Sequence, residues 1–176
     1  MIFNRLTRIH IAALAIILVA TVSSCVGYKL GNNKPTHLQG VNSVSVPIFK
    51  NETLEPRLQS LATNATIKAL QQSGAYLISK PSNSDATLHA TIKSISRRQL
   101  RATRENVLRT KEIEFIIEVT FFLEDNRTGR LLDKGSVEGN STSYLDSNFQ
   151  LTKRQSIQLA ANDLAKKISA RMSEGF

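Results

Sequence analysis

Residues 111–124 carry the clearest alternation of apolar and polar side chains in the sequence. The apolar set comprises Ile113, Phe115, Ile117, Val119, Phe121 and Leu123. The positions between them include Glu112, Glu114, Glu118, Thr120 and Glu124. Successive side chains of a strand point to opposite faces of a sheet, so the pattern predicts a strand with one buried face and one face open to water or to a partner. The segment 125–129 (DNRTG) predicts a hairpin turn into a weaker strand over 130–142.

Two other segments repeat apolar residues at the spacing of a helix. In residues 53–72 the stripe comprises Leu54, Leu58, Leu61, Ala62, Ala65 and Ala69. Thr53 is a suitable N-cap for this helix, and Gly74 is suitable for its end. In the C-terminal segment the stripe comprises Ile157, Ala160, Ala161, Leu164 and Ile168. Ser147 and Gln150 fit a capping box at the start of this second helix.

Shorter strands are predicted over residues 44–48, 75–79 and 88–92, from alternation and from the turn residues around them. The predicted order is one strand, a helix, four strands and a final helix. Two helices with one apolar stripe each can cover one face of a sheet. We therefore expect an α+β fold: a two-layer α/β sandwich whose mostly antiparallel, four- to five-stranded sheet carries both helices on one face.

The N-terminal residues have the pattern of an export leader. Arg5 and Arg8 precede an apolar run over residues 9–22, which is shorter than the roughly 20 residues of a membrane span. The chain's only cysteine follows, and Val22-Ser23-Ser24-Cys25 resembles a bacterial lipobox, in which the cysteine is acylated and becomes the N-terminus after cleavage. The alternatives are an uncleaved anchor helix and a cysteine placed there by chance.

The lipobox interpretation divides the chain into three parts. Residues 1–24 are a lipoprotein signal peptide, 25–40 are the acylated cysteine and a flexible tether, and 41–176 form a single α/β sandwich domain. Two or three acyl chains on Cys25 anchor a protein stably in a lipid bilayer. Val26 stands where an aspartate would resemble an inner-membrane retention signal, which favours the outer membrane. We expect a lipid-anchored protein on the periplasmic side of that membrane.

Composition limits the chemistry that we expect. The histidines beyond the leader, His37 and His89, have no ligand-spaced companions, and no phosphate loop or nucleophile elbow occurs. We therefore expect no metal, no cofactor and no enzymatic activity. The formal net charge of +9 suggests an anionic partner. Export from the cytoplasm, and the lack of aromatic residues among the clustered arginines, argue against nucleic acid.

The positive charge is concentrated in residues 97–111, which hold six basic residues and one acidic residue. The basic residues are Arg97, Arg98, Arg101, Arg104, Arg109 and Lys111. One interpretation is a loop that binds a phosphorylated or acidic ligand, because clustered guanidinium groups bind phosphate well. The other is a solvated hairpin extension whose arginines discourage edge-to-edge aggregation. Ile116 and Phe122 project to the otherwise polar face of the long strand and are candidate contacts with a partner.

Three segments together resemble the lipopolysaccharide-assembly lipoprotein family, LptE. They are Cys25–Leu30 (CVGYKL), Val44–Pro56 (VSVPIFKNETLEP) and Ser84–Ala90 (SDATLHA). The resemblance implies an outer-membrane lipoprotein that partners and plugs the LptD β-barrel and assists lipopolysaccharide transport. It also implies that basic residues bind lipopolysaccharide, for which the segment 97–111 is the candidate. The valine-rich first strand also resembles lipoprotein activators of peptidoglycan synthases, which remain the alternative.

Overall fold

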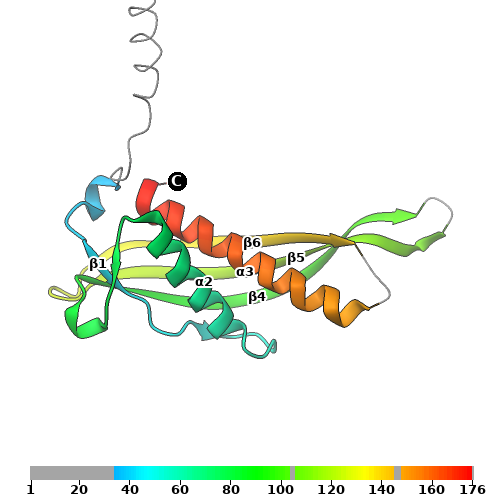
Figure 1. The fold of residues 1–176 in the computed structure, drawn as a ribbon, viewed down its shortest axis with the longest axis horizontal. Helices are drawn as coiled ribbons and strands as arrows, with labels where there is room; N and C mark the ends of the chain where they lie inside the picture. Colours follow the sequence, from blue (N-terminus) through cyan, green and yellow to red (C-terminus); the bar gives the residue numbers. More distant parts are fainter. Residues whose placement is uncertain (1–33, 104–105, 145–147, 176) are drawn as a thin grey trace, which may run out of the picture. The chain divides into compact units, whose positions relative to one another are not determined.

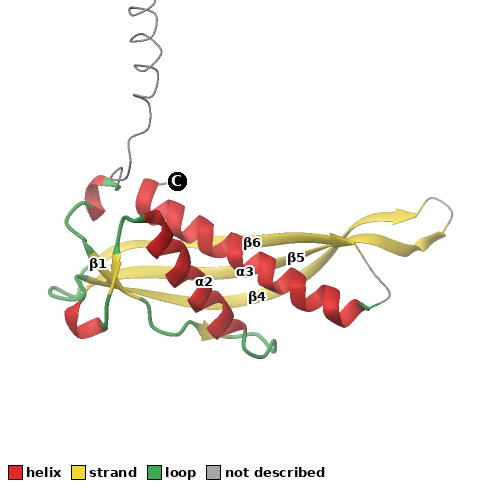
Figure 2. Ribbon diagram, viewed as in Figure 1, coloured by secondary structure: helices red, strands yellow, loops and turns green. Residues whose placement is uncertain are grey.

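The computed structural model describes residues 34–103, 106–144 and 148–175, with the side chains of residues 101–111 outside the description. Within these residues two long helices, α2 (Leu58–Ser73) and α3 (Phe149–Glu174), lie on one face of a six-stranded sheet (Figures 1 and 2). The predicted α+β sandwich with both helices on one face is confirmed. Neither these helices nor any other described helix is long and apolar enough to cross a membrane.

Three long strands form an antiparallel meander that makes up most of the sheet. These are β4 (Ala86–Thr103), β5 (Asn106–Asp125) and β6 (Leu131–Tyr144). Three short strands join them by parallel pairing: β1 (Ser43–Ser45) and β2 (Lys50–Asn51) pair with β4, and β3 (Leu77–Ile78) pairs with β1. The sheet is therefore mixed, because α2 is a crossover connection that returns the chain in its original direction.

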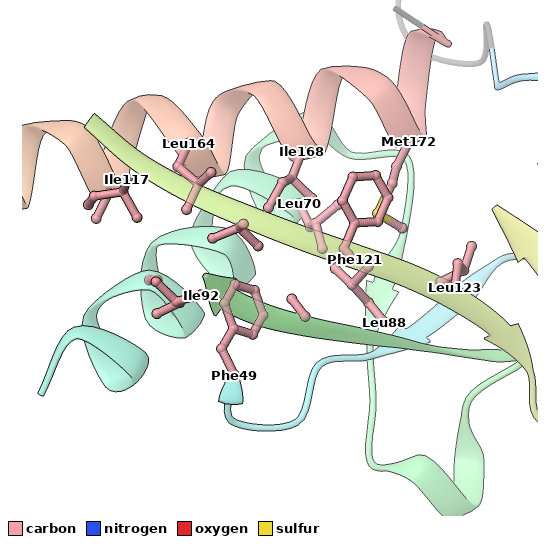
Figure 3. Close-up of a cluster of buried hydrophobic side chains, with 14 of the residues drawn as sticks. Phe49, Leu70, Leu88, Ile92, Ile117, Phe121, Leu123, Leu164, Ile168 and Met172 are labelled. Carbon is pink, nitrogen blue, oxygen red and sulfur yellow. The ribbon is translucent and has the colours of Figure 1, made fainter. Parts of the chain in front are cut away.

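The alternation over residues 111–124 is confirmed by the burial of β5. Its six predicted apolar side chains are all at most 4% exposed and belong to the hydrophobic core, in which Figure 3 shows Ile117, Phe121 and Leu123. The stripe predicted for α3 is also buried throughout. Ile117 and Phe121 of β5 meet Leu164 and Ile168 of α3 in one continuous cluster.

The start of α2 differs from the prediction. The helix begins at Leu58 rather than Thr53, and Leu54 is fully exposed instead of belonging to the buried stripe. The Asn51 side chain organises the preceding loop: its carbonyl oxygen accepts hydrogen bonds from the backbone N–H and the hydroxyl of Thr53, at 3.0 and 2.8 Å. Arg57 then occupies the N-cap position of α2 in the left-handed conformation, with a φ of 63°. Gly74 ends the helix in the left-handed conformation, as predicted.

The start of α3 also differs by one position from the predicted capping box. Asn148 is the N-cap, and its side chain accepts a hydrogen bond from the backbone N–H of Leu151 at 3.1 Å. Ser147, the predicted cap, lies outside the described residues. An asparagine performs the same task as a serine, because both offer an oxygen to a free N–H of the first turn.

The packing of α3 against β6 depends on small residues. At Gly139 an added Cβ would overlap the carbonyl oxygen of Ala160 and lie 2.5 Å from the Cβ of Leu164. Nearby, the Ser141 hydroxyl donates to the Ser156 carbonyl at 2.7 Å. The helix backbone therefore lies directly on the strand backbone at this point, with no side chain between them.

The N-terminal part of the described chain packs on the domain. Residues 34–40, assigned to the tether from the sequence, include the short helix η2 (Thr36–Leu38), and Leu38 is fully buried. The Lys34 ammonium donates to the Val41 carbonyl at 2.8 Å and lies 4.5 Å from the centre of the Tyr76 ring. Burial lowers the pKa of Lys34. The Tyr76 hydroxyl in turn donates to the Met172 carbonyl at 2.6 Å.

Candidate functional site

The basic segment 97–111 is mostly strand rather than loop. β4 extends to Thr103 and β5 starts at Asn106, and the two pair with each other almost to their ends. β6 ends opposite Glu112, so the last residues of β4 and the first of β5 continue as a two-stranded ribbon beyond the rest of the sheet (Figure 1). This arrangement corresponds to the hairpin extension among the two interpretations, and a ligand role for its arginines remains a prediction.

Strand geometry separates the first two arginines of this segment. Arg97 pairs with Phe115 and lies on the face that carries the helices. Arg98 pairs with Glu114 and lies on the opposite face, which no described helix covers. The sequence suggested one cluster because the residues are adjacent, but the period of two in a strand sends them to different surfaces.

Arg98 is engaged in an ion pair. Its Nη2 lies 2.6 Å and its Nε 3.0 Å from Oε2 of Glu114, whose carboxylate is largely buried. The guanidinium compensates a charge that would otherwise be costly to bury. We therefore assign Arg98 a structural part in the sheet, and it offers little free charge to a ligand.

Arg97 lines a cavity of about 300 Å³ between the sheet, the loop before α2 and the start of α3. Its guanidinium carbon is 5.4 Å from the centre of the Phe149 ring, a cation–π arrangement. Ile95 and Phe115 contribute the sheet side of the cavity. On its rim Lys153 of α3 forms an ion pair of 2.6 Å with Glu55, which precedes α2.

The other predicted basic residues are less fully described. Arg101 pairs through its backbone with Glu112, and Arg109 and Lys111 belong to β5, but the side chains of all three lie outside the description. Arg104 lies wholly outside the described residues, as does Cys25 with the leader. The roles predicted for these residues remain predictions.

Ile116 and Phe122 lie on the uncovered face of the sheet, as their positions in the alternation predict. Phe122 is 42% exposed and stacks on the His89 ring, with centroids 4.8 Å apart. Ile116 is half-buried and pairs with Asn140 of β6, whose side-chain oxygen is buried without a hydrogen-bond partner among the described residues. This face thus combines an exposed aromatic ring with an acceptor that is not satisfied within the described chain.

A second hollow, of about 510 Å³, lies by the turn between β5 and β6 and is mainly polar. Asp85 and Asp125 line it, but backbone N–H groups occupy their carboxylates and hold the pKa of each carboxyl below its ordinary value. Arg127 and Arg130 line the same hollow from the turn. The hollow therefore carries two acidic and two basic side chains, at the end of the sheet away from the ribbon.

Sequence reasoning missed the cavity beside Arg97. Its lining comes from the loop before α2, from β4, from β5 and from the start of α3, which are far apart in the chain. Phe149 was the one available signal, since it is an aromatic residue at the first position of a helix. Nothing in the spacing of these residues indicates that they meet.

The fold is shared with several bacterial proteins of low sequence identity. A hypothetical protein, CT253, from Chlamydia trachomatis has a TM-score of 0.54 at 13% identity, with 75% of this chain and 95% of that chain covered. A minor lipoprotein from Acinetobacter baumannii has a TM-score of 0.52 at 14% identity, with 76% and 94% covered. The PelC dodecamer from Paraburkholderia phytofirmans has a TM-score of 0.50 at 18% identity, with 75% and 88% covered. No curated protein matches the sequence.

These similarities show the fold, an α/β sandwich that is also the fold of a bacterial minor lipoprotein. The family follows from the sequence itself, because the profile of LptE, lipopolysaccharide-assembly, matches residues 41–172. The chain belongs to this family. The match covers nearly the whole described domain, and it confirms the resemblance seen in the short motifs. The family is one of assembly proteins rather than enzymes.

Proposed function

We propose that this protein is an outer-membrane lipoprotein, anchored through acylated Cys25, that partners and plugs an LptD-type β-barrel in lipopolysaccharide transport. The family match over residues 41–172 is the observation that carries the proposal. The signal peptide over residues 1–24 and the tether that follows it are part of the same proposal. The domain supplies the plug, and the anchor holds it on the periplasmic side of the outer membrane.

The uncovered face of the sheet supports a role in binding a partner. Both helices lie on the other face, so this face is open along β4, β5 and β6. A buried acceptor with no partner, such as that of Asn140, normally finds a donor in a native complex or in water. Phe122 adds an exposed aromatic ring of the kind enriched at interfaces. We assign Ile116 and Phe122 to the barrel interface.

The ribbon supports a role in binding lipopolysaccharide. Two strands without further neighbours are only marginally stable by themselves in water, so a contact that orders them is favourable. The segment 97–111 carries a net charge of +5 from six basic residues and one acidic residue. Guanidinium groups bind phosphate in bidentate fashion, and lipopolysaccharide bears phosphates on its lipid A. We assign this contact to Arg97, Arg101, Arg104, Arg109 and Lys111, and leave Arg98 to its pair with Glu114.

Affinity purification of the lipidated protein from membranes tests the partner. Recovery of a large β-barrel is the expected result, whereas recovery of a peptidoglycan synthase without a barrel would replace the proposal by its alternative. Ile116→Lys and Phe122→Lys together should reduce recovery of the barrel. Leu159→Lys, on a residue of α3 that is 54% exposed, is the matched control and should leave recovery unchanged.

Charge reversal tests the lipopolysaccharide contact. The triple variant of Arg97, Arg101 and Arg104 to glutamate should weaken binding to purified lipopolysaccharide in a pull-down. The control reverses three exposed basic residues elsewhere on the domain and changes the net charge equally: Lys68, Lys80 and Arg154. Equal loss in both variants would show that only total charge matters. Unchanged binding in the first variant would remove the ligand role from the ribbon.

A further inference from the structure

The two edges of the sheet, formed by β6 and β4, differ in how far other residues cover their backbone groups. Side chains of α3 cover the outer edge of β6 at three backbone groups. Asp163 accepts from the Asn140 N–H at 2.9 Å, Lys167 donates to the Glu138 carbonyl at 2.8 Å, and Arg171 donates to the Lys134 carbonyl at 2.9 Å. These contacts occupy groups that a further strand would need.

The opposite edge, formed by β4, has no such cover over its distal half. β1 pairs with β4 at Ala86–Thr87 and β2 pairs with it at Thr91–Ile92, and no described strand pairs on that side beyond this point. The backbone N–H and carbonyl groups of alternate residues point outward there. The Ile92 carbonyl, which accepts from the Glu52 N–H at 3.0 Å, marks the last outward position in use.

The register identifies which residues present free groups after the bulge at Lys93. The backbone N–H of Asn140 and the backbone carbonyl of Glu138 point away from β5. The odd-numbered residues of β6 therefore make the backbone hydrogen bonds to the odd-numbered residues of β5. The even-numbered residues of β5 then bond to Ser94, Ser96 and Arg98 of β4. Ile95, Arg97 and Gln99 therefore direct their N–H and carbonyl groups outward. No described residue makes a hydrogen bond to these groups on that side.

The cavity of about 300 Å³ lies beside this edge, on the helix side of the sheet. Ile95, Phe115 and Phe149 give it an apolar lining. A strand added beyond β4 would direct alternate side chains to the same side of the sheet as Ile95 and Arg97. An apolar side chain of such a strand would enter the cavity, which replaces water by apolar contact.

The charge of Arg97 indicates which side chain the added strand would carry two residues from its apolar side chain. Arg97 is exposed and has no acidic partner among the described residues, only the Phe149 ring. The other cation of the rim, Lys153, is already paired with Glu55. A carboxylate two residues from the apolar side chain would lie on the same face and meet Arg97.

We propose that the edge of β4 at Ile95–Gln99 receives an extended segment of a partner protein by strand addition, with an apolar side chain in the cavity and an acidic side chain against Arg97. Main-chain hydrogen bonds supply affinity in this mode, and the pocket supplies selectivity. The proposal concerns a protein segment and goes beyond the barrel and lipopolysaccharide contacts proposed above. It shares Arg97 with the proposed lipopolysaccharide contact, whereas the proposed barrel contact lies on the opposite face of the sheet.

Amide hydrogen exchange on the full domain tests the proposal directly. In the free protein the amides of Ile95, Arg97 and Gln99 should exchange fast, while those of Ser96 and Arg98 are protected by β5. The probe is the capped peptide acetyl-Thr-Leu-Thr-Asp-Thr-Val-Thr-amide at about 1 mM, a concentration suited to weak strand pairing. It should slow the three outward amides and leave the other two unchanged. No added protection, or protection of all three in dilute free protein, would overturn the proposal.

Variants distinguish strand addition from other contacts. Arg97→Pro removes an outward N–H without touching the ladder to β5, as edge positions allow, and should weaken peptide binding roughly threefold to tenfold. Phe149→Ala should weaken it by a similar factor, whereas Phe122→Ala on the opposite face should have no effect. Replacing the peptide's aspartate by lysine should also weaken binding. Protection that rises with protein concentration alone would show that the edge serves a second copy of this chain, and would contradict the proposal.

Discussion

Replacing Gly139 by alanine is the most informative test of how the two layers are joined. The new Cβ would overlap the Ala160 carbonyl oxygen and lie 2.5 Å from the Leu164 Cβ and 2.8 Å from the Leu164 nitrogen. Two of these three atoms belong to the helix backbone, which no rotamer change can move away. α3 must therefore shift away from β6, and the shift separates side chains that pack below it.

The magnitude follows from the cost of overpacking a well-packed core. Such insertions cost about 1–3 kcal/mol, and a clash with backbone places this one at about 3 kcal/mol. A domain of this size loses about 2–4 °C in Tm per kcal/mol, so we expect a decrease of about 6–12 °C. Since total stability is about 5–15 kcal/mol, the variant should remain folded at room temperature.

Two further glycines complete the series. Gly135→Ala meets only the end of the Arg171 side chain, at 2.9 Å from its guanidinium carbon, so the side chain can move and the loss should be smaller. At Gly40 an added Cβ has no atom within 4 Å, and alanine there should be neutral or slightly stabilising. Urea unfolding at pH 7, with thermal scans beside it, measures all three. A Gly139→Ala variant as stable as the Gly40→Ala variant would refute the close approach of α3 to β6.

Other expected outcomes concern single polar contacts. Arg98→Met should lower the free energy of unfolding by about 1–3 kcal/mol, because it leaves the buried Glu114 carboxylate without its partner; Glu114→Gln should cost less, and the reverse order in urea unfolding would contradict the argument. The depressed pKa of Asp85 means that its contribution is present above its unfolded pKa of about 4 and is lost as pH falls through the folded pKa. Asp85→Asn should therefore reduce the loss of stability over the range of about pH 5 to 2, where carboxyl groups titrate. An unchanged dependence of stability on acid pH would contradict this role of Asp85. Burial raises the pKa of Tyr76 to about 12, so its contribution is complete below about pH 10 and is lost as pH rises toward 12. Tyr76→Phe should remove that alkaline loss of stability and lower the free energy of unfolding by about 1 kcal/mol at pH 7. Unfolding measured at pH 7 and above about pH 10 checks both effects.

The fold could be predicted where one period dominated the sequence. β5 and α3 carry uninterrupted apolar patterns, and their buried residues are those predicted. The start of α2 could not be predicted in the same way, because Thr53 bonds to Asn51 and a left-handed Arg57 begins the helix instead. Parallel pairing of β1 and β2 with β4 also has no local signal, since two- and three-residue strands are fixed by the elements beside them.

In the candidate site, too, the features set by a sequence period could be predicted, and those set by packing could not. The uncovered position of Phe122 follows directly from the alternation of β5. The basic segment was interpreted either as a ligand-binding loop or as a hairpin extension, and neither interpretation placed Arg97 and Arg98 on opposite faces of a strand. The length of β4 determines this outcome, and its later residues are too polar to be recognised as strand from hydrophobic pattern alone. The cavity beside Arg97 arises only when distant segments pack together.

The cover that α3 places over β6 has a consequence for stoichiometry. A fibril grows because every added chain offers a fresh edge identical to the one it used. Here Asp163, Lys167 and Arg171 occupy three outward backbone groups of β6, so a chain joined through β4 does not offer these groups to a further strand. Strand pairing therefore cannot propagate from one copy to the next through these three positions of β6.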